Sequence, residues 1–261
     1  MSGPPRRTYG FEWSLSFFRS VLWIAPLILL ATAFWGLGSL LVSFFDRGGR
    51  KQAWMARQWA RTLLWVSGTR VTIEGLEQLD PGQNYIFVAN HRSYMDTPVL
   101  LASLPGQFRF MAKKSLFRIP LLGGHLGRAG HIPVPGGNPR EAIASMTEAG
   151  RTIREQGISV LIFPEGGRTM GAMQPFREGA AFLGIKSGVP LAPVALLGTH
   201  ELLPMHSVHV RPRRVILRIA PPISTLGLDL RQRGELTAQL FTVISQMVEA
   251  GPAAPVPPAG R

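Results

Sequence analysis

The amino-acid sequence predicts an α/β domain, with a mixed or mostly parallel sheet flanked by helices, behind an N-terminal membrane-associated helical element. Two observations support this fold class. From Val21 to Phe45 the chain runs for 25 residues without a charged side chain. After Gly68, short apolar runs alternate with stretches of helical periodicity, which is typical of strands and helices that alternate along the chain.

These patterns divide the chain into three parts. We expect membrane-anchoring helices over residues 1–66, the α/β domain over 67–250, and a disordered tail rich in proline and alanine over 251–261. With 46% hydrophobic residues the chain can bury a core, and its net charge of +13 predicts an anionic partner. No nucleic-acid-binding motif is recognisable, so we expect a membrane surface or a phosphorylated substrate and no nucleic acid. The absence of cysteine excludes disulfides, a thiolate nucleophile and cysteine-ligated metal.

The apolar stretch from Val21 to Phe45 is long enough to cross a bilayer as a helix. A cleaved signal peptide usually has a shorter apolar region and a cleavage site of small residues, whereas this stretch ends in two phenylalanines. A spanning helix and a re-entrant hairpin, broken at Pro26 or at Gly36 and Gly38, both remain open.

Cationic residues are more numerous after the apolar stretch than before it. Those that follow are Arg47, Arg50, Lys51, Arg57 and Arg61. This distribution predicts that the domain after the stretch lies on the cytoplasmic side of the cell inner membrane. Residues 51–66 interleave tryptophans with arginines, which fits a helix in the headgroup region or a core helix with a solvated basic face.

The α/β part begins with the strand pattern and continues with helices between the strands. The runs that indicate strands are Val71–Ile73, Tyr85–Val88, Phe108–Met111, Ser159–Phe163, Ala192–Leu197 and Val215–Ile219. Helices are predicted over Pro98–Ser103, from Pro139 onward behind an Asn138 cap, over Gly179–Ser187 and over Leu228–Glu249. The nearly continuous apolar strands suit a sheet covered on both faces.

A histidine and an aspartate are placed around one strand-to-helix turn. His91 follows the apolar run YIFVA, and Asp96 stands where the next helix begins. An aspartate that accepts one ring N–H fixes the histidine tautomer and leaves the other nitrogen as a base. Alternatively, Asp96 only caps the helix and His91 is a turn residue.

A second polar turn follows the apolar run VLIF. It contains Glu165, Gly166, Gly167 and Arg168. The glycine pair allows a close approach of the backbone to an anion, and Arg168 offers a planar charged fork that suits phosphate. We expect Glu165 to orient Arg168 or to accept a hydrogen bond from a substrate hydroxyl; a polar turn with a surface ion pair is the alternative.

These motifs, in this order, resemble the glycerolipid acyltransferase family of the bacterial 1-acylglycerol-3-phosphate (lysophosphatidate) acyltransferase type. That family shows an Asn-His-x4-Asp block, a lysine-led block, a Phe-Pro-Glu-Gly block and a final strand with proline. The corresponding segments here are 90–96, 114–124 continuing to 130–134, 163–169 and 189–194. Two positions depart from the pattern: Gly167 stands where threonine is common, and Pro135 where an arginine is frequent.

The resemblance implies a reaction and a set of partners. His91 would deprotonate the free hydroxyl of lysophosphatidate as it attacks the thioester of acyl-CoA or acyl-carrier protein, giving phosphatidate without a metal, a cofactor or an acyl-enzyme. Lys114, Glu165, Gly166, Gly167 and Arg168 would bind substrate, and Lys114 or the N–H groups near Gly123 would face the oxyanion. There are two alternatives. The acceptor is another lysophospholipid or glycerol 3-phosphate, or the chain is a non-catalytic membrane protein that binds anionic lipid.

The remaining histidines have no assigned role. His200, His206 and His209 could suggest a metal site, but loop histidines are the simpler interpretation. His125 and His131 lie in the glycine-rich stretch after Lys114, where they either line a substrate groove or are exposed.

Overall fold

The computed structural model of the chain describes residues 10–46, 48–135, 139–168 and 170–251. The predicted helix cap Asn138 and all of the predicted tail except Gly251 lie outside these residues.

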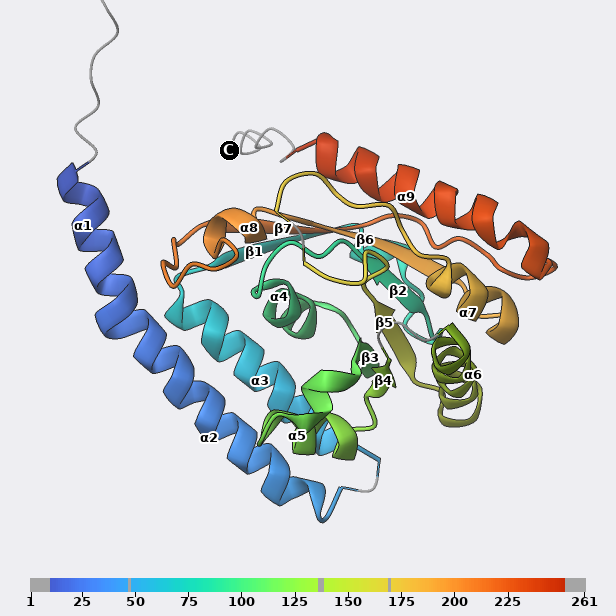
Figure 1. The fold of residues 1–261 in the computed structure, drawn as a ribbon, viewed down its shortest axis with the longest axis horizontal. Coiled ribbons are helices and arrows are strands. Elements are labelled where there is room, and N and C mark those ends of the chain that lie inside the picture. The colour runs from blue at the N-terminus through green and yellow to red at the C-terminus, as the bar shows by residue number, and fades with distance from the viewer. Residues whose placement is uncertain (1–9, 47, 136–138, 169, 252–261) are drawn as a thin grey trace, which may run out of the picture.

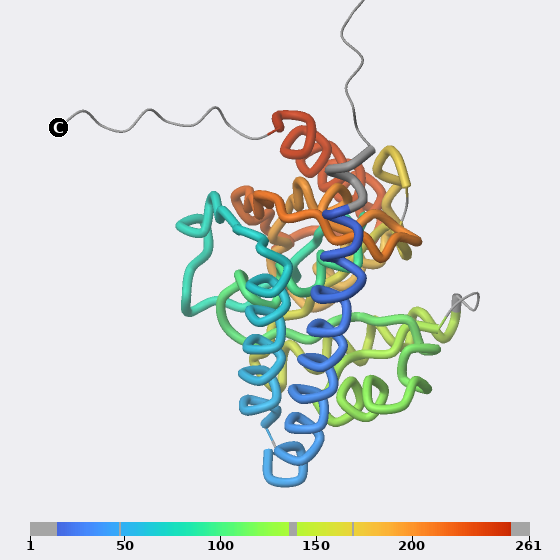
Figure 2. The backbone as a smooth tube through the Cα atoms, turned by 90° about the vertical axis from the view of Figure 1, so that its left-hand side faces the viewer, coloured from blue at the N-terminus to red at the C-terminus, as the bar shows by residue number. Residues whose placement is uncertain are grey.

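The N-terminal element is a long helix followed by a second helix that returns along it (Figure 2). Helix α1 (Gly10–Arg19), the π-helical turn η1 (Ser20–Ile24) and α2 (Ala25–Ser43) continue into one another, and α3 (Arg50–Val66) lies beside α2. Neither Pro26 nor the Gly36 and Gly38 pair breaks the helix, so a re-entrant hairpin formed within this stretch is the wrong alternative. The π-turn directly before Pro26 is one of the known ways a helix accommodates such an interruption.

The segment Leu15–Ser43 is long and apolar enough to cross a membrane by length and composition. Its mean hydropathy is 2.0, and only 6% of its most apolar window is buried inside the molecule. A core helix of a soluble protein would be mostly buried, so the exposed apolar face of α2 indicates association with a membrane.

Seven strands form one sheet in the order β1-β7-β6-β2-β5-β3-β4 (Figure 1). The strands are β1 (Arg70–Glu74), β2 (Ile86–Ala89), β3 (Phe108–Lys113), β4 (Ile132–Val134), β5 (Ser159–Ile162), β6 (Leu191–Leu197) and β7 (Arg214–Ile219). All neighbours pair in parallel except β6 and β7. The predicted mixed, mostly parallel sheet is therefore confirmed.

Helices cover both faces of the sheet, and alternate strand residues enter two cores (Figure 1). Phe87 and Ala89 pack with the α3 and α4 side, whereas Ile86 and Val88 pack with the α6, α7 and α9 side. The helices and 3-10 turns not yet named are η2 (Leu76–Gln78), α4 (Asp96–Ser103), η3 (Lys114–Arg118), α5 (Leu122–Arg128), α6 (Pro139–Gln156), α7 (Gly179–Ser187), α8 (Thr199–Leu202), η4 (Leu230–Gln232) and α9 (Arg233–Glu249).

The structure corrects several predicted boundaries. The helix predicted from Leu228 begins at Arg233, after the η4 turn that Asp229 caps. The helix predicted from Pro98 begins at Asp96, and β4 was not predicted as a strand. Residues 51–66 do form a helix, which buries part of its surface against α2 and α4 and leaves Trp54 and Trp65 exposed.

Strands β6, β2 and β5 are parallel neighbours, so their carboxyl ends meet at one edge of the sheet. Ligands of open α/β sheets bind at this edge. The loop after β2 carries His91, and the loop after β5 carries Glu165 and Arg168.

Candidate active site

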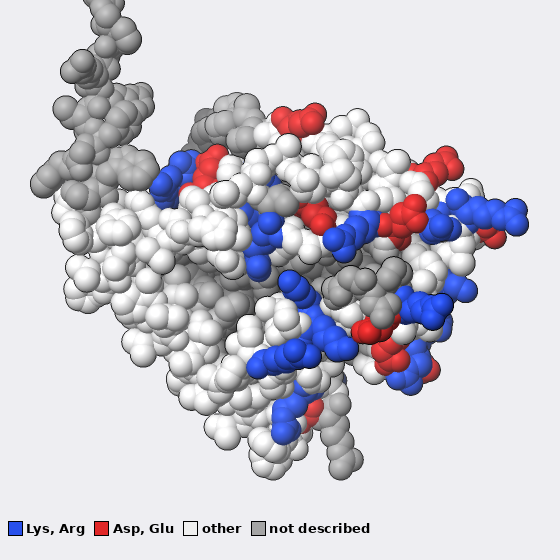
Figure 3. All heavy atoms as spheres, viewed as in Figure 1, with Lys and Arg blue, Asp and Glu red and all other residues white. Residues whose placement is uncertain are grey.

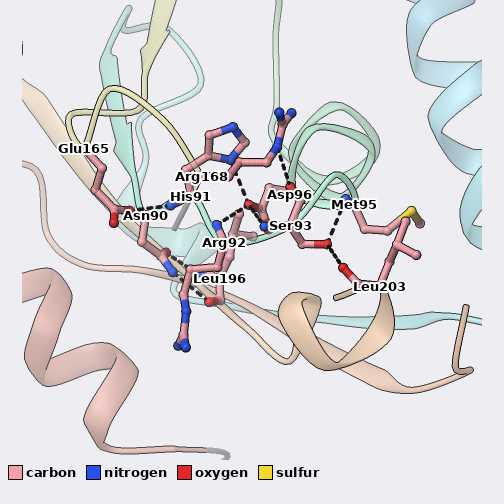
Figure 4. A network of polar contacts seen from close by, with 10 residues as sticks. All are labelled: Asn90, His91, Arg92, Ser93, Met95, Asp96, Glu165, Arg168, Leu196 and Leu203. Atoms are coloured by element: carbon pink, nitrogen blue, oxygen red, sulfur yellow. Dashed lines mark hydrogen bonds and ion pairs between the residues drawn. The ribbon is translucent and has the colours of Figure 1, made fainter. Parts of the chain in front are cut away.

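His91 and Asp96 form the pair that the sequence predicts (Figure 4). His91 Nδ1 lies 2.8 Å from Asp96 Oδ2, and the Asp96 side chain is fully buried. The same oxygen accepts the backbone N–H groups of Arg92 and Ser93, at 2.7 and 2.8 Å. An oxygen that accepts from two amides acts as an acceptor toward the ring as well, so Nδ1 carries the proton and Nε2 keeps its lone pair.

The alternative that Asp96 only caps the helix is wrong. A capping side chain accepts from N–H groups of the helix that follows it. The Asp96 carboxylate instead accepts from Arg92 and Ser93, which precede it, and Asp96 is itself the first residue of α4. The Asp96 carboxylate therefore holds the loop that precedes it, together with the His91 ring.

Two further contacts hold His91. Its ring stacks on Phe163, with centroids 3.7 Å apart and an interplanar angle of 13°. The preceding residue, Asn90, donates to Leu196 O and accepts from Leu196 N, which ties the loop to β6. His91 is 7% exposed, and its Nε2 has no hydrogen-bond partner among the described residues. The structure thus presents one restrained, unpaired ring nitrogen at the sheet edge.

Glu165 supports the same loop from β5. Its Oε1 accepts the backbone N–H of His91 at 2.7 Å, and its Oε2 accepts that of Gln174 at 3.0 Å. Gly166 follows with a φ of +77°, a backbone conformation that favours glycine. In this conformation the Glu165 carboxylate positions the backbone of the histidine.

Arg168 is oriented by the His91 loop. Its Nε donates to Ser93 O at 3.1 Å, and its guanidinium lies 4.5 Å above the centre of the Tyr94 ring. Burial lowers the pKa of Arg168, and the nearby Asp96 and Tyr94 act in the opposite direction. Because arginine remains charged in proteins, this leaves a half-buried cation beside the His91–Asp96 pair.

Lys114 and Gly123 lie in other contacts. The Lys114 ammonium pairs with Glu141 of α6 at 3.3 Å, and its side chain is 57% exposed. Gly123 N donates to Ile119 O at 2.7 Å, so this N–H is not available to an oxyanion in the conformation described. At Gly167 a side chain would meet nothing within 4 Å, so the fold does not require glycine there.

An apolar cavity of about 470 Å³ lies between the α2–α3 pair and the β3–α5 region. Its wall includes Thr97, which follows Asp96, and Phe110. The Phe110 ring stacks on Phe163 at 6.4 Å, and Phe163 stacks on His91. One end of the cavity therefore borders the His91 site. A second cavity of about 760 Å³ opens near Asn84 and Gln107, where β2 and β3 begin, and lies away from this site.

The remaining histidines separate into two groups. His125 and His131 line the apolar cavity; that this cavity is a substrate groove stays a prediction. His209 contacts Ser16 of α1 at 3.0 Å. Within the described ranges no group of three or more His, Asp or Glu side chains is placed to hold a metal ion.

Sequence reasoning missed Phe163 and Tyr94 as parts of the site. Each holds a functional side chain through a ring stack, which leaves no spacing pattern in the sequence. Their only signal is position, because Phe163 directly follows β5 and Tyr94 lies inside the His91–Asp96 loop.

Residues 70–197, which contain the His91 loop and the Glu165–Arg168 turn, match the acyltransferase family. The likeness to this family thus covers the segment that carries both polar turns. The crystal structure of the 1-acyl-sn-glycerophosphate acyltransferase from Thermotoga maritima superposes on the chain with a TM-score of 0.75. It is 25% identical, and the alignment covers 90% of this chain and 96% of that one.

Curated relatives are similar to part of this chain over part of their own length. The 1-acyl-sn-glycerol-3-phosphate acyltransferase of Limnanthes douglasii is 35% identical over 164 residues, which are 62% of this chain and 58% of that protein. The alpha enzyme of Bos taurus is 31% identical over 165 residues, which are 63% and 58%. The chain thus spans little more than half the length of these relatives.

Proposed function

We propose that this protein transfers a fatty acyl group from an acyl thioester to the free hydroxyl of lysophosphatidate, forming phosphatidate. The observation that carries the proposal is the His91–Asp96 pair, which leaves Nε2 of a restrained, nearly buried histidine free at the carboxyl ends of the strands. The names of the curated relatives and of the Thermotoga maritima structure support lysophosphatidate as the acceptor.

His91 acts as a general base in this reaction. Nε2 removes the proton of the acceptor hydroxyl as its oxygen attacks the thioester carbonyl, and the imidazolium is stabilised by Asp96. The tetrahedral intermediate collapses, the carbon–sulfur bond breaks, and the leaving thiolate takes the proton from the His91 imidazolium, which restores the neutral base. One ester and one thiol result. No acyl-enzyme is required in this scheme, and the thiol is that of CoA or of acyl-carrier protein.

Arg168 is the cation that suits the acceptor phosphate. Its guanidinium lies beside Asp96 and is held by Ser93 and Tyr94, so it is oriented before substrate arrives. The apolar cavity that borders Phe110 provides room for the acyl chain of the thioester. Its volume of about 470 Å³ is in the usual range of ligand pockets.

We further propose that the protein works at the cytoplasmic face of a cell inner membrane. In Figure 3, viewed as in Figure 1, the surface over α2 is almost free of charge, while lysines and arginines gather over the middle of the molecule. Arg50, Lys51, Arg57 and Arg61 follow the apolar helix, as the positive-inside rule expects. Because the chain has no cysteine, a single Lys186→Cys variant tests this: an impermeant maleimide should label it only after cells are lysed.

The function is tested by thiol release. Palmitoyl-CoA is incubated with and without lysophosphatidate, thiol is followed with a reactive dye, and phosphatidate is identified by mass spectrometry. The protein adds no thiol background, because it has no cysteine. We expect release that requires acceptor and falls about 10²–10⁴-fold in His91→Ala. His206→Asn is the control, since His206 is exposed with a φ of +60° that asparagine tolerates.

The outcomes separate the candidate functions. Acceptor-independent release would indicate a thioesterase. Glycerol 3-phosphate and other lysophospholipids are tested in parallel, and a faster rate with one of them would reassign the acceptor. Tight lysophosphatidate binding without release from either palmitoyl-CoA or palmitoyl-carrier protein would contradict the enzyme and favour a lipid-binding protein.

A further inference from the structure

The apolar cavity has one polar end, and the proposed function does not account for it. The polar side chains in its wall include Ser39 of α2, Gln52 of α3, Arg109 of β3, His125 of α5 and His131 before β4. They come from separate elements, and contacts connect several of them. Ser39 Oγ lies 2.7 Å from His125 Nδ1, and the rings of His125 and His131 are 5.8 Å apart.

His131 presents a hydrogen-bond donor to this cavity. Its Nδ1 accepts the backbone N–H of Phe110 at 2.9 Å, so in the neutral ring the proton is on Nε2. Burial, His125 and Arg109 lower the pKa of His131 to about 3, which keeps the ring neutral at physiological pH. No described residue accepts a hydrogen bond from Nε2.

Gln52 presents both a donor and an acceptor. Its side chain is fully buried, and neither Oε1 nor Nε2 has a hydrogen-bond partner among the described residues. Buried amides are almost always paired, because an unpaired one keeps the full cost of its lost hydration. Gln52 backbone N is held by Asp46 Oδ2 at 2.8 Å, which fixes the first turn of helix α3 at this wall.

The polar groups extend away from His91, beginning at His131, whose ring lies 5.6 Å from that of Phe110. Thr97 and Phe110 border the site, whereas Ser39 and Gln52 lie toward the turn that joins α2 to α3. Figure 1 shows α5 packed against this lower half of the two helices. An acyl chain that enters beside His91 therefore reaches the polar groups with carbons distant from its thioester.

We propose that the cavity takes acyl chains that carry a hydroxyl group away from the thioester, with the hydroxyl paired to Gln52 and His131. A hydroxyl donates one hydrogen bond and accepts others, which Gln52 Oε1, Gln52 Nε2 and His131 Nε2 can satisfy. A carboxylate would suit the cluster less, because Asp46 already acts on the Arg109 charge and the other groups are neutral. The inference rests on the proposed function, since the hydroxyacyl thioester is then the acyl donor.

Binding is measured first, without catalysis. Trp35 and Trp59 line the cavity, so intrinsic fluorescence of the His91→Ala protein reports fatty-acid binding. The probes are palmitate, ω-hydroxypalmitate and palmitates hydroxylated near mid-chain. We expect one hydroxy isomer to bind about tenfold more tightly than palmitate, and Gln52→Met to remove that preference. Gln58→Met, on the same helix but outside the cavity lining, should retain it.

Thermal unfolding gives a second readout. Gln52→Met removes an unpaired buried amide with little change in shape, so the ligand-free variant should unfold at the same temperature as the wild type or a higher one. A clear fall in that temperature would show that Gln52 is paired within the protein, and would overturn the assignment.

Transfer is then measured with palmitoyl-CoA and with the CoA ester of the preferred hydroxy isomer. A higher rate with the hydroxy donor, lost in Gln52→Met but not in Gln58→Met, supports the inference. Equal transfer rates with the two donors would overturn the inference and leave the proposed function intact. The same holds if Gln52→Met changes only the acyl-chain length that the protein accepts. A binding preference without transfer from any thioester supports the ligand assignment while the proposed function fails.

Discussion

Asp96 shows how much of the site depends on a single oxygen atom. Oδ2 holds the His91 ring and two loop amides at 2.7 to 2.8 Å, so one carboxylate sets both the tautomer of the base and the path of its loop. An amide in its place offers one oxygen for three donors and can turn its own N–H groups toward the ring.

We therefore expect Asp96→Asn to lower kcat for acyl transfer by about 10²–10⁴-fold, with a smaller change in KM for lysophosphatidate. Steady-state kinetics measure the two constants, and circular dichroism confirms that the variant is folded. A kcat within a few fold of the wild type would show that the carboxylate does not assist His91.

Tyr94 is a positioning residue for Arg168. A cation–π contact at a partly exposed site contributes about 0.5–1 kcal/mol, so Tyr94→Leu should raise KM for lysophosphatidate roughly two- to fivefold while kcat changes little. Tyr94→Phe keeps the ring and should behave as the wild type. If Tyr94→Phe raised KM as much as Tyr94→Leu, the Tyr94 hydroxyl rather than its ring face would position Arg168.

The sequence identifies His91 and Asp96 because they belong to one short loop whose spacing encodes their contact. Phe163, Tyr94 and Gln52 could not be found in that way, because their roles arise from stacking and burial across separate elements. Glu165 was recognised, yet its contacts were not: the His91 amide that it binds is 74 residues away in the chain.

At the scale of elements, the long apolar strands were predicted well, whereas the short strand at the sheet edge was not. Strands β5 and β6 are buried along nearly their whole length and have a clear apolar signal. Strand β4 has three residues, one of them Pro133, and lies at the sheet edge, so neither length nor periodicity reveals it. The order of the strands depends on pairing between distant segments, which no local pattern records.

The β1–β7 pair provides a test of packing between elements. Gly75 has a φ of +77°, and a Cβ there would lie 2.1 Å from Ile219 O. Gly227 has a φ of +79° with nothing within 4 Å of its Cβ position. We expect Gly227→Ala to cost about 1–2 kcal/mol of unfolding free energy and Gly75→Ala about 3 kcal/mol or more. Thermal or denaturant unfolding measures both, and equal costs would show that backbone conformation alone matters at Gly75.

At the scale of the whole molecule, the apolar side chains of α2 stand out because they are exposed rather than packed in a core. Leu30 and Phe34 are 66% and 69% exposed and lie one helical turn apart. Leu30→Arg and Phe34→Arg should each shift protein from the membrane pellet to the supernatant, because a mid-bilayer arginine costs about 2.5–3.5 kcal/mol. Leu226→Arg, at a leucine 77% exposed outside the N-terminal helices, is the control. Unchanged sedimentation of the α2 variants would place the membrane contact elsewhere.

The strand order also has a consequence for biosynthesis. Because β1 is an edge strand next to β7, the first strand to leave the ribosome pairs with the last. His91 can meet Asp96 early, but Asn90 reaches its partner Leu196 only after another 106 residues have been made. By then α2 has long been available to a bilayer. The nascent chain can therefore engage the membrane well before the loop around His91 is held in place, so the site is completed where the proposed lipid substrates are found.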